Sequence, residues 1–378
     1  MIKHDFIPVN EPLLNGNEKK YLDQCIDTGW ISSEGPFVKR FEKEFASRMG
    51  RKYGIAVTNG SSAIDVAVDA LGIGPDDEVI LPTFTIISCI LQIMRSGAKP
   101  VLVDSDPITW NMDVSKIEEK VTSKTKAIMV VHIYGLPVDM DPVLEICKKY
   151  KLKLIEDSAE QIGQTYKEKP CGSFGDISTV SFYPNKHITT GEGGMVLTDS
   201  ENLANICRES RNLCFMPNKR FIHERFGWNF RMTNLQAALG LAQLERLDQF
   251  IVKKRWIGNM YNELLSDVPD ILLPLKETEY AKNIYWVYGL VLDKTLDVSA
   301  KEIMDNLNNQ GIGCRPFFYP MHQQPVLNKL GLFKNESHPV AEKLYQKGLY
   351  LPSGLNITEE QIVRVSTILK NIIQKLKL

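Results

Sequence analysis

Residues 181–194 read Ser181-Phe182-Tyr183-Pro184-Asn185-Lys186-His187-Ile188-Thr189-Thr190-Gly191-Glu192-Gly193-Gly194, with one lysine between two apolar segments. Residues 177–182 and 194–198, on either side, predict buried β-strands. A charged amine between core strands is costly unless it is solvated, paired or neutral. A lysine held neutral near physiological pH is a nucleophile of the kind that Schiff-base chemistry uses. Most loop lysines are simply solvated, so a role for Lys186 depends on the groups that the rest of the chain brings near it.

Short β-rich runs alternate with helical segments on both sides of this stretch, from residue 53 onward. Such alternation is typical of parallel strands joined by crossover helices. We therefore predict an α/β fold with a mostly parallel seven-stranded sheet and flanking helices. The predicted strands are 53–58, 78–81, 100–104, 127–132, 152–157, 177–182 and 194–198, and the predicted helices are 61–71, 86–96, 142–150 and 202–212.

The 378 residues are too many for one small core. We predict an N-terminal arm (1–30), a large domain (31–250) and a smaller C-terminal α+β domain (251–378), with one long helix over 235–254 at the boundary. The net charge of -1 gives no nucleic-acid or membrane footprint. The seven cysteines are scattered without C-x-x-C spacing, so neither a disulfide framework nor a structural zinc site is expected. No histidine pair has ligand spacing, so we expect no metal. With no signal peptide in sight, we expect the cytoplasm.

Ligands of parallel sheets bind at the carboxyl ends of the strands, so the residues at these ends are candidates. Gly60, Ser61 and Ser62 open a helix after the first strand and predict a phosphate site, although an ordinary serine N-cap is the alternative. Asp157 ends the fifth strand, where a structural ion pair is the alternative to a functional carboxylate. His132 ends a strand, and we expect it to be a buried histidine with its hydrogen bonds satisfied and not a catalytic residue.

A phosphate cradle, a buried carboxylate and Lys186 on one sheet are together what pyridoxal 5′-phosphate requires. Ser181, five residues before Lys186, can reach the same phosphate. The sequence has no dinucleotide or P-loop fingerprint, which argues against an NAD-dependent sugar oxidoreductase.

Seven motifs make the chain resemble the DegT/StrS family of sugar aminotransferases, which are pyridoxal-phosphate enzymes of fold type I. The resemblance covers nearly the whole chain, and Glu160 with residues 315–322 (RPFFYPMH) is most similar to the GDP-perosamine synthase branch. The motifs are TNGSSA (58–63), PTFT (82–85), VDSD (103–106), HIYGLPVDM (132–140), EDSAE (156–160), GSFGDISTVSFYPNKHITTGEGG (172–194) and FRMTNLQAALGLAQLERLD (230–248).

The resemblance implies a role for each matching residue. Lys186 would form the Schiff base and Asp157 would pair with the pyridinium nitrogen. Asn229 would reach the phosphate of the neighbouring subunit's cofactor, so that the active site lies at a homodimer interface. The implied cofactor-binding residues are Gly60, Ser61, Ser62, Asp157, Glu160, Ser181, Lys186 and Asn229. The implied nucleotide-sugar residues are Arg315, Phe317, Phe318, Tyr319 and His322.

The implied reaction converts GDP-4-keto-6-deoxy-D-mannose to GDP-perosamine, with L-glutamate as donor and the pyridoxamine form of the cofactor as intermediate. UDP- or dTDP-linked sugars, amination at C3, and a dimer against a tetramer remain open alternatives. A non-catalytic pyridoxal-phosphate-binding regulator is disfavoured because Lys186, Asp157 and the serines are intact.

Two departures from the family pattern bear on this prediction. An aromatic residue usually stacks on the cofactor where this chain has Ile86, so either Ile86 or Phe84 covers the ring. Tyr183, Pro184 and His187 resemble the 3-dehydratase branch, which carries a histidine in place of Lys186. Because a histidine is unable to form the imine that anchors the cofactor, the lysine favours transamination.

Overall fold

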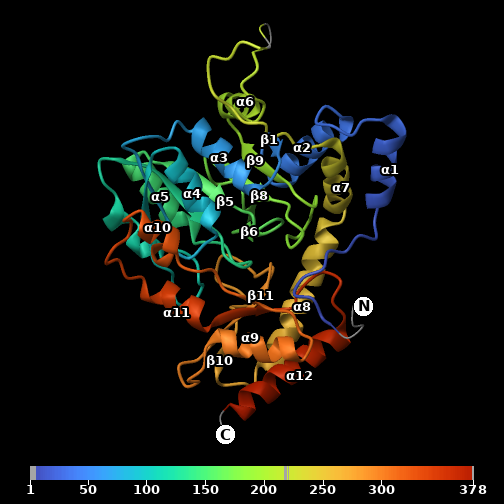
Figure 1. Ribbon diagram of the computed structural model, residues 1–378, viewed down its shortest axis with the longest axis vertical. Helices are drawn as coiled ribbons and strands as arrows, with labels where there is room; N and C mark the ends of the chain where they lie inside the picture. The colour runs from blue at the N-terminus through green and yellow to red at the C-terminus, as the bar shows by residue number, and fades with distance from the viewer. Residues whose placement is uncertain (1–5, 217–218, 220, 377–378) are drawn as a thin grey trace.

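The computed structural model describes residues 6–216, 219 and 221–376, and its upper part in Figure 1 is built on one seven-stranded sheet. The strand order is β1-β9-β8-β5-β4-β2-β3. The pairs from β8 to β3 are parallel, whereas β9 runs antiparallel to both of its neighbours. The predicted sheet is therefore confirmed. Its strands are β1 (Tyr53–Val57), β2 (Glu78–Pro82), β3 (Lys99–Val103), β4 (Thr125–Val131), β5 (Lys153–Asp157), β8 (Ile177–Ser181) and β9 (Gly194–Thr198).

Both faces of this sheet are buried, which explains why its strands are apolar without alternation. In β4, Met129 and Val131 join one apolar cluster, while Ile128 and Val130 join another on the opposite face. The covering helices include the four predicted ones, each displaced by no more than two residues at either end. They are α2 (Pro36–Arg48), α3 (Gly60–Ala70), α4 (Ile87–Arg95), α5 (Met140–Tyr150) and α6 (Glu201–Ser210), whereas α1 (Glu18–Thr28) lies outside this layer and packs against the helix at residues 234–244.

The single long helix predicted over 235–254 is wrong, because the structure has two helices there. Helix α7 (Asn234–Leu244) begins with a capping box between Thr233 and Gln236. The backbone leaves helical geometry at Arg246 (φ -113°, ψ 7°), and α8 (Leu247–Leu265) follows. Since Leu247 and Phe250 are buried immediately after the break, the apolar pattern continues across it and hides it in the sequence.

The second sheet is antiparallel, has the order β10-β11-β13-β12, and lies below the first in Figure 1. Helix α8 leads from the upper part into this lower part, so the predicted boundary after residue 250 falls inside a helix. That boundary stays a prediction. The lower elements are β10 (Ile271–Leu272), β11 (Tyr288–Leu292), α9 (Ala300–Asn309), β12 (Arg315–Pro316), α10 (Pro325–Lys329), α11 (Pro339–Lys347), β13 (Gly348–Leu351) and α12 (Glu359–Lys375).

Within the described ranges, no helix is both long and apolar enough to cross a membrane.

Candidate active site

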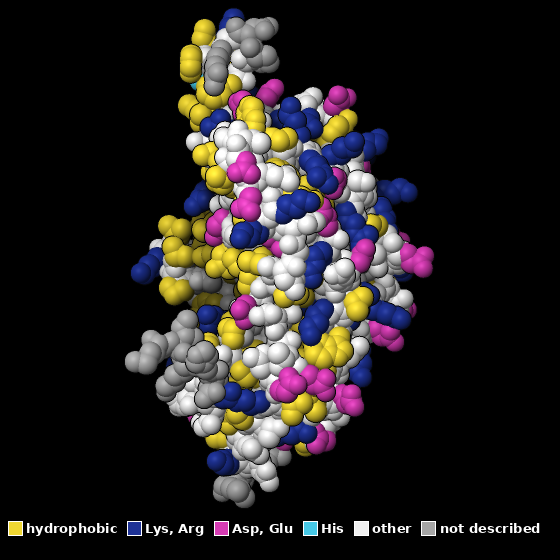
Figure 2. All heavy atoms as spheres, turned by 90° about the vertical axis from the view of Figure 1, so that its right-hand side faces the viewer, with side chains coloured by type: hydrophobic (Ala, Val, Ile, Leu, Met, Phe, Trp, Pro, Cys, Tyr) yellow, Lys and Arg dark blue, Asp and Glu magenta, His cyan; other side chains and the backbone are white. Residues whose placement is uncertain are grey.

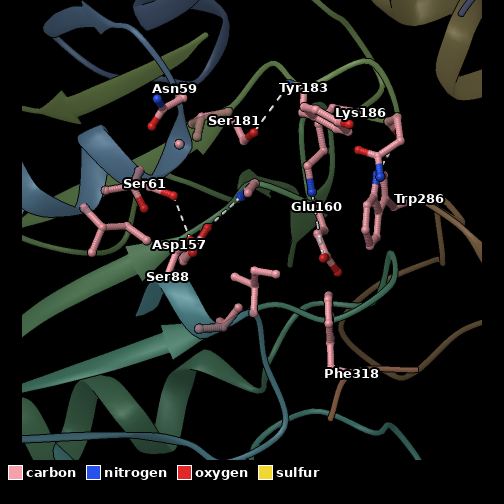
Figure 3. Close-up of a pocket in the computed structure, with 18 of the residues that line it drawn as sticks. Asn59, Ser61, Ser88, Asp157, Glu160, Ser181, Tyr183, Lys186, Trp286 and Phe318 are labelled. Carbon is pink, nitrogen blue, oxygen red and sulfur yellow. Dashed lines mark hydrogen bonds and ion pairs between the residues drawn. The ribbon is translucent and has the colours of Figure 1, made fainter. Parts of the chain in front are cut away.

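A cavity of about 570 Å³ lies at the carboxyl ends of β4, β5 and β8, where ligands of parallel sheets bind. The strand ends contribute Val131, Asp157 and Ser181 to its lining, and α3 contributes its first turn. Figure 3 shows Lys186 and Glu160 on one side of the cavity and Asn59, Ser61 and Ser181 on another. The volume is in the range of small-molecule and cofactor sites.

Lys186 lies beside one carboxylate and one aromatic ring. Its Nζ is 3.8 Å from Oε1 of Glu160 and 3.8 Å from the centre of the Trp286 ring. The two charged side chains are only 11% and 6% exposed. Burial lowers the pKa of Lys186 and raises that of Glu160, against the attraction between them. The neutral amine that a nucleophile or base requires is thus favoured more than it would be in water.

Asp157 ends β5 and presents its carboxylate to the cavity with few donors. Oδ1 accepts the N–H of Ala159 at 3.0 Å, and Oδ2 accepts the thiol of Cys89 at 3.4 Å. Burial raises the pKa of Asp157, although these bonds and the charge of Lys186 act in the opposite direction. A buried carboxylate with so few donors is stabilised by any cationic or N–H group that a ligand brings.

The N-terminus of α3 forms the wall opposite Lys186 (Figure 3). Gly60 and Ser61 are first-turn residues, whose N–H groups have no acceptor inside the helix. A Cβ on Gly60 would lie 2.8 Å from Cβ of Ser181, so only glycine lets the two segments approach this closely. The hydroxyl of Ser61 bonds that of Ser88 at 2.7 Å. These groups, with the positive end of the helix dipole, suit a phosphate.

Ser62 takes a different place from the one that the resemblance implies. Its N–H donates to the side chain of Asn59, the N-cap of α3, and its hydroxyl bonds Thr58. The side chain is buried and is not among the cavity-lining residues. The helix is thus capped by Asn59 and not by one of the serines, and a role for Ser62 in phosphate binding stays a prediction.

The structure separates the two candidates for covering a cofactor ring. Phe84 is fully buried and its ring packs against those of Tyr134, Phe317 and Phe318. Ile86 is 45% exposed and lines the cavity. Of the two, only Ile86 can contact a ligand there.

The residues expected on the nucleotide-sugar side are spread more widely than the sequence indicates. Phe318 lines the cavity (Figure 3), whereas Phe317 is buried in the aromatic cluster around Phe84. His322 is buried and bonds Thr83 and Glu342. Arg315 is exposed at β12, and the Tyr319 ring packs against a tyrosine of α11. Substrate contacts of Arg315, Phe317, Tyr319 and His322 stay predictions.

Asn229 is exposed on the segment after α6 and is not among the residues that line the cavity of this chain. Its Oδ1 accepts from Nε and Nη2 of Arg231, at 3.1 and 2.8 Å. The amide Nδ2 is therefore the end that can donate to a ligand. The neighbouring Phe230 carbonyl accepts the N–H of Thr58, which anchors the segment beside α3.

Several lining residues carry no sequence signal that points to the cavity. They come from segments far from the motifs or have ordinary side chains for their position. Asn185 is the clearest functional candidate among them, since its buried Oδ1 has no hydrogen-bond partner among the described residues. The lining residues outside the predicted set include Asn59, Ser88, Asn185, Trp286 and Tyr350.

The groups present fit pyridoxal 5′-phosphate. The helix end with Gly60, Ser61 and Ser181 suits a phosphate, and Asp157 suits a ring nitrogen. The amine of Lys186 lies on the far side of the same cavity. An orphaned acceptor on Asn185 leaves room for a further donor from a ligand.

Comparison with known proteins agrees with this geometry. Residues 12–370 match the model of the DegT/DnrJ/EryC1/StrS aminotransferase family. The chain is 42% identical to the GDP-perosamine synthase of Escherichia coli O157:H7 (95% of this chain, 96% of that protein) and 42% identical to the GDP-perosamine synthase of Caulobacter vibrioides (97% and 98%). The solved structure of the aminotransferase from Psychrobacter cryohalolentis superposes with a TM-score of 0.91 at 29% identity, covering 99% of this chain and 100% of that one. The chain belongs to the DegT/DnrJ/EryC1/StrS aminotransferase family.

Proposed function

We propose that this aminotransferase moves the amino group of L-glutamate to the C4 ketone of GDP-4-keto-6-deoxy-D-mannose and so forms GDP-perosamine. The observation that carries the proposal is the Lys186 amine, which shares one cavity with the carboxylates of Asp157 and Glu160 and the N-terminus of α3. The relatives named GDP-perosamine synthases, similar over nearly their full length, support the choice of sugar.

Bound pyridoxal 5′-phosphate supplies an aldehyde carbon that carries an amino group between two substrates, and a ring that accepts electrons. In our proposal Gly60, Ser61 and Ser181 hold its phosphate. Asp157 holds the proton of the ring nitrogen, which also compensates the cost of burying this carboxylate. Glu160 and Lys186 lie together on the reacting side.

Lys186 has two tasks in the proposed reaction. Its Nζ removes the proton from Cα of glutamate and later delivers a proton to C4 of the sugar. The first task needs an unprotonated amine and the second a protonated one. Burial lowers the pKa of Lys186 and raises that of Glu160. One proton can therefore reside on the amine of Lys186 or on the carboxylate of Glu160 at neutral pH, so that both states of the amine are accessible.

A sugar 3-dehydratase is the alternative reaction, suggested by Tyr183 and His187. Tyr183 lines the cavity, but His187 is fully buried and does not. Burial also lowers the pKa of His187 to about 3, so its ring is neutral at physiological pH. Because it does not line the cavity, it is not placed to contact a substrate. The neighbourhood of Lys186 thus offers one proton-transfer pair, Lys186 with Glu160, which is what transamination needs.

We also propose that two copies of the chain share each active site. The cavity lining contains no cation besides Lys186 among the described residues, although a phosphate carries two negative charges. The segment after α6 projects from the top of the molecule in Figure 1, and its Phe221 and Phe226 are 83% and 99% exposed. Asn229 lies where this segment returns, paired with Asn212. Figure 2 shows hydrophobic side chains gathered at this projection. Exposed aromatic side chains of this kind mark an interaction surface, and a second copy is the partner we propose.

The substrate is tested with GDP-, UDP- and dTDP-linked 4-keto-6-deoxyhexoses, each incubated with glutamate and read by mass spectrometry. We expect the mass of a 4-amino sugar with the GDP-linked compound alone. A deoxy sugar without added nitrogen would identify a dehydratase, and no product with any keto-sugar would refute the proposal.

The shared site is tested by mixing two inactive variants. Lys186→Ala should lose both the visible colour of the bound cofactor and all turnover, and Asn229→Ala should bind the cofactor weakly. Refolding the two chains together creates one wild-type site per mixed dimer, so we expect colour and activity to return. No recovery, with mixed dimers present by native mass spectrometry, would show that Asn229 acts within its own chain or not at all.

A further inference from the structure

Lys254 is a second buried lysine, and it lies outside the cavity. It belongs to α8 and is 1% exposed. Its Nζ donates to the carbonyl oxygens of Trp286 at 2.7 Å and Ser353 at 2.6 Å. It forms no ion pair with any carboxylate of the described residues, and burial lowers its pKa to about 7. An amine kept in the interior for two carbonyl groups alone is unusual enough to need an explanation.

The two carbonyl groups belong to segments that flank the lower sheet. Trp286 precedes β11, and Ser353 follows β13, the strand paired with β11. The backbone turn before Trp286 is constrained as well, since Tyr285 has a left-handed φ of 48° and its N–H is held by Asn283. By bonding the carbonyl of Trp286, Lys254 therefore fixes the position and orientation of the backbone there.

Trp286 connects this buried lysine to the one in the cavity. Its indole Nε1 donates to the carbonyl oxygen of Asn185 at 2.7 Å, and its ring lies 3.8 Å from Nζ of Lys186. Figure 3 shows the indole alongside Lys186. One side chain thus positions the turn that carries Lys186 and covers the amine itself. A ring in this place also excludes water from one side of the amine.

We propose that Lys254 is a positioning residue for Lys186: by holding the carbonyl of Trp286 it sets the indole that orients the Lys186 turn and covers its amine. The proposal rests on the role of Lys186 given above. Lys254 touches neither substrate nor cofactor, so its removal should change the reactivity of the amine without removing it.

The test compares Lys254→Met with Lys253→Met in the cofactor-loaded enzyme. Lys253 precedes Lys254 on the same helix, and its amine lies over the ring of Trp256 at 3.6 Å, away from this network. Lys254→Met keeps the volume and removes the donor. We expect kcat to fall about 10- to 100-fold, the size of effect that small misplacements of reacting groups produce. The pH midpoint of the cofactor's visible absorbance should also shift, and Lys253→Met should match the wild type in both measurements.

A readout on the cofactor-free protein separates positioning from catalysis. The N–H of Lys186 is bonded to the carbonyl of Tyr183 at 2.9 Å, so its exchange with deuterium reports the order of this turn. We expect peptides covering residues 183–190 to exchange faster in Lys254→Met than in Lys253→Met. Equal exchange and an unshifted absorbance midpoint, in a variant that is folded by circular dichroism, would overturn the proposal.

Trp286→Phe tests the connection even if Lys254→Met fails to fold, because it removes the N–H donor and keeps a ring. We expect it to lower kcat and speed exchange at 183–190 in the same way, and wild-type behaviour would overturn the proposal. Where both variants fold, the effects of Lys254→Met and Trp286→Phe should combine to less than their product, since they break one path. Effects that multiply would show that Lys254 acts independently of Trp286. Colour and turnover in Lys186→Ala would instead refute the role of Lys186 itself.

Discussion

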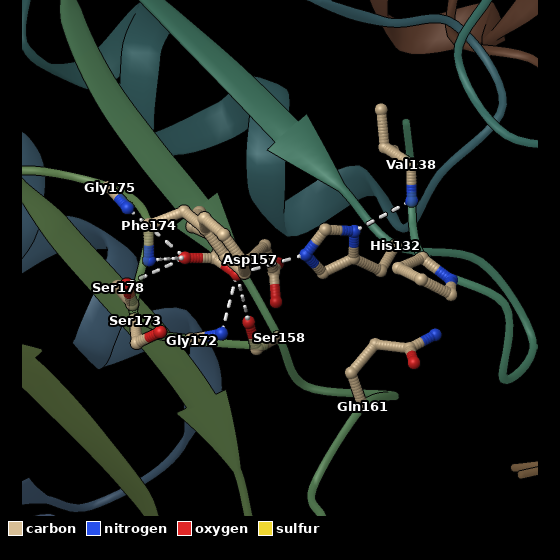
Figure 4. Close-up of polar contacts among 12 residues, drawn as sticks. His132, Val138, Asp157, Ser158, Gln161, Gly172, Ser173, Phe174, Gly175 and Ser178 are labelled. Atoms are coloured by element: carbon tan, nitrogen blue, oxygen red, sulfur yellow. Dashed lines mark hydrogen bonds and ion pairs between the residues drawn. The ribbon is translucent and has the colours of Figure 1, made fainter. Parts of the chain in front are cut away.

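Glu156 and Asp157 are adjacent buried carboxylates at the end of β5, yet their surroundings differ completely. Neighbouring residues of a strand face opposite sides of the sheet, so Asp157 faces the cavity and Glu156 faces away from it. Glu156 accepts hydrogen bonds from the N–H groups of Phe174 and Gly175 and from Nε2 of His132, which in turn accepts the N–H of Val138 through Nδ1. In Figure 4 the dashed lines from Phe174, Gly175 and His132 converge on one unlabelled carboxylate, which these hydrogen bonds identify as that of Glu156.

The pKa values of the two carboxylates shift in opposite directions, as their different surroundings predict. Burial alone would raise the pKa of Glu156, but His132 and the surrounding N–H groups outweigh it and hold the pKa at about 2. For Asp157 burial prevails and the pKa is raised. Burial therefore does not mark a functional carboxylate, whereas burial with incomplete hydrogen bonding does. We therefore expect substitutions of Glu156 to change stability and substitutions of Asp157 to change activity.

Asp157→Asn should have the largest effect, on activity. An amide is unable to hold the ring nitrogen's proton, so kcat/KM should fall at least about 10³-fold, or about 4 kcal/mol in transition-state free energy. The thermal midpoint of the cofactor-free protein should stay equal or rise, because a costly buried charge is gone. The rate of amine formation and calorimetry measure the two quantities. A loss below tenfold would remove Asp157 from the chemistry.

Glu156→Gln should produce the opposite pattern. In either orientation its amide nitrogen would face buried N–H donors, those of Phe174 and Gly175 or that of Gly172, and would leave them unpaired. We therefore expect the free energy of unfolding to fall by about 3 kcal/mol. Urea unfolding of the cofactor-free protein measures this change. Activity at a temperature where the variant is folded should fall far less than in Asp157→Asn. A variant as stable as the wild type would show that the donors are satisfied without the charge.

The acid dependence of stability should differ in sign between the two carboxylates. The folded pKa of Glu156, about 2, lies below its ordinary value of 4.5. Its stabilisation is therefore complete above pH 4.5 and is lost as the pH falls toward 2, at up to about 1.4 kcal/mol per pH unit. Asp157 has a raised pKa, so the folded state binds its proton first and acidification relieves a cost.

Urea unfolding between pH 5 and pH 3 tests this contrast. Relative to the wild type, Glu156→Gln should lose less stability on acidification and Asp157→Asn should lose more. Parallel curves for all three proteins would mean that neither carboxylate titrates differently in the folded and unfolded states.

Part of the site follows from the sequence alone. Ser61, Lys186 and a carboxylate at the end of β5 were predictable because polar residues lie at or shortly after the ends of apolar strands, and strand ends meet at one edge of a parallel sheet. The sequence EDSAE does not say which of its first two carboxylates faces the cavity. That depends on which helices cover each face. Besides His132, the donors to Glu156 include backbone N–H groups of a loop, which leave no signature in residue type.

The other site residues that the sequence did not predict also depend on tertiary packing. Trp286 precedes β11 and Tyr350 lies in β13, and only the packing of the lower sheet against the upper one places them beside Lys186. Asn59 takes the capping role that the sequence assigns to the serines, because the helix begins one residue earlier than predicted. The break at Arg246 is hidden because buried side chains continue on both sides of it.

The smallest expected effect concerns Cys89, whose thiol is the one side-chain donor to Asp157 among the described residues, at 3.4 Å. Cys89→Ala removes that donor and should lower kcat/KM about 3- to 10-fold, since one weak hydrogen bond to a charged group is worth about 1 kcal/mol. Cys89→Ser keeps a donor and should restore most of the loss. Cys147→Ala, which changes a buried cysteine of α5 outside the cavity lining, is the control and should leave kcat/KM unchanged. If Cys89→Ala and Cys89→Ser were equally active, the hydrogen bonding of Asp157 would be irrelevant to its function, and the contrast with Glu156 would rest on position alone.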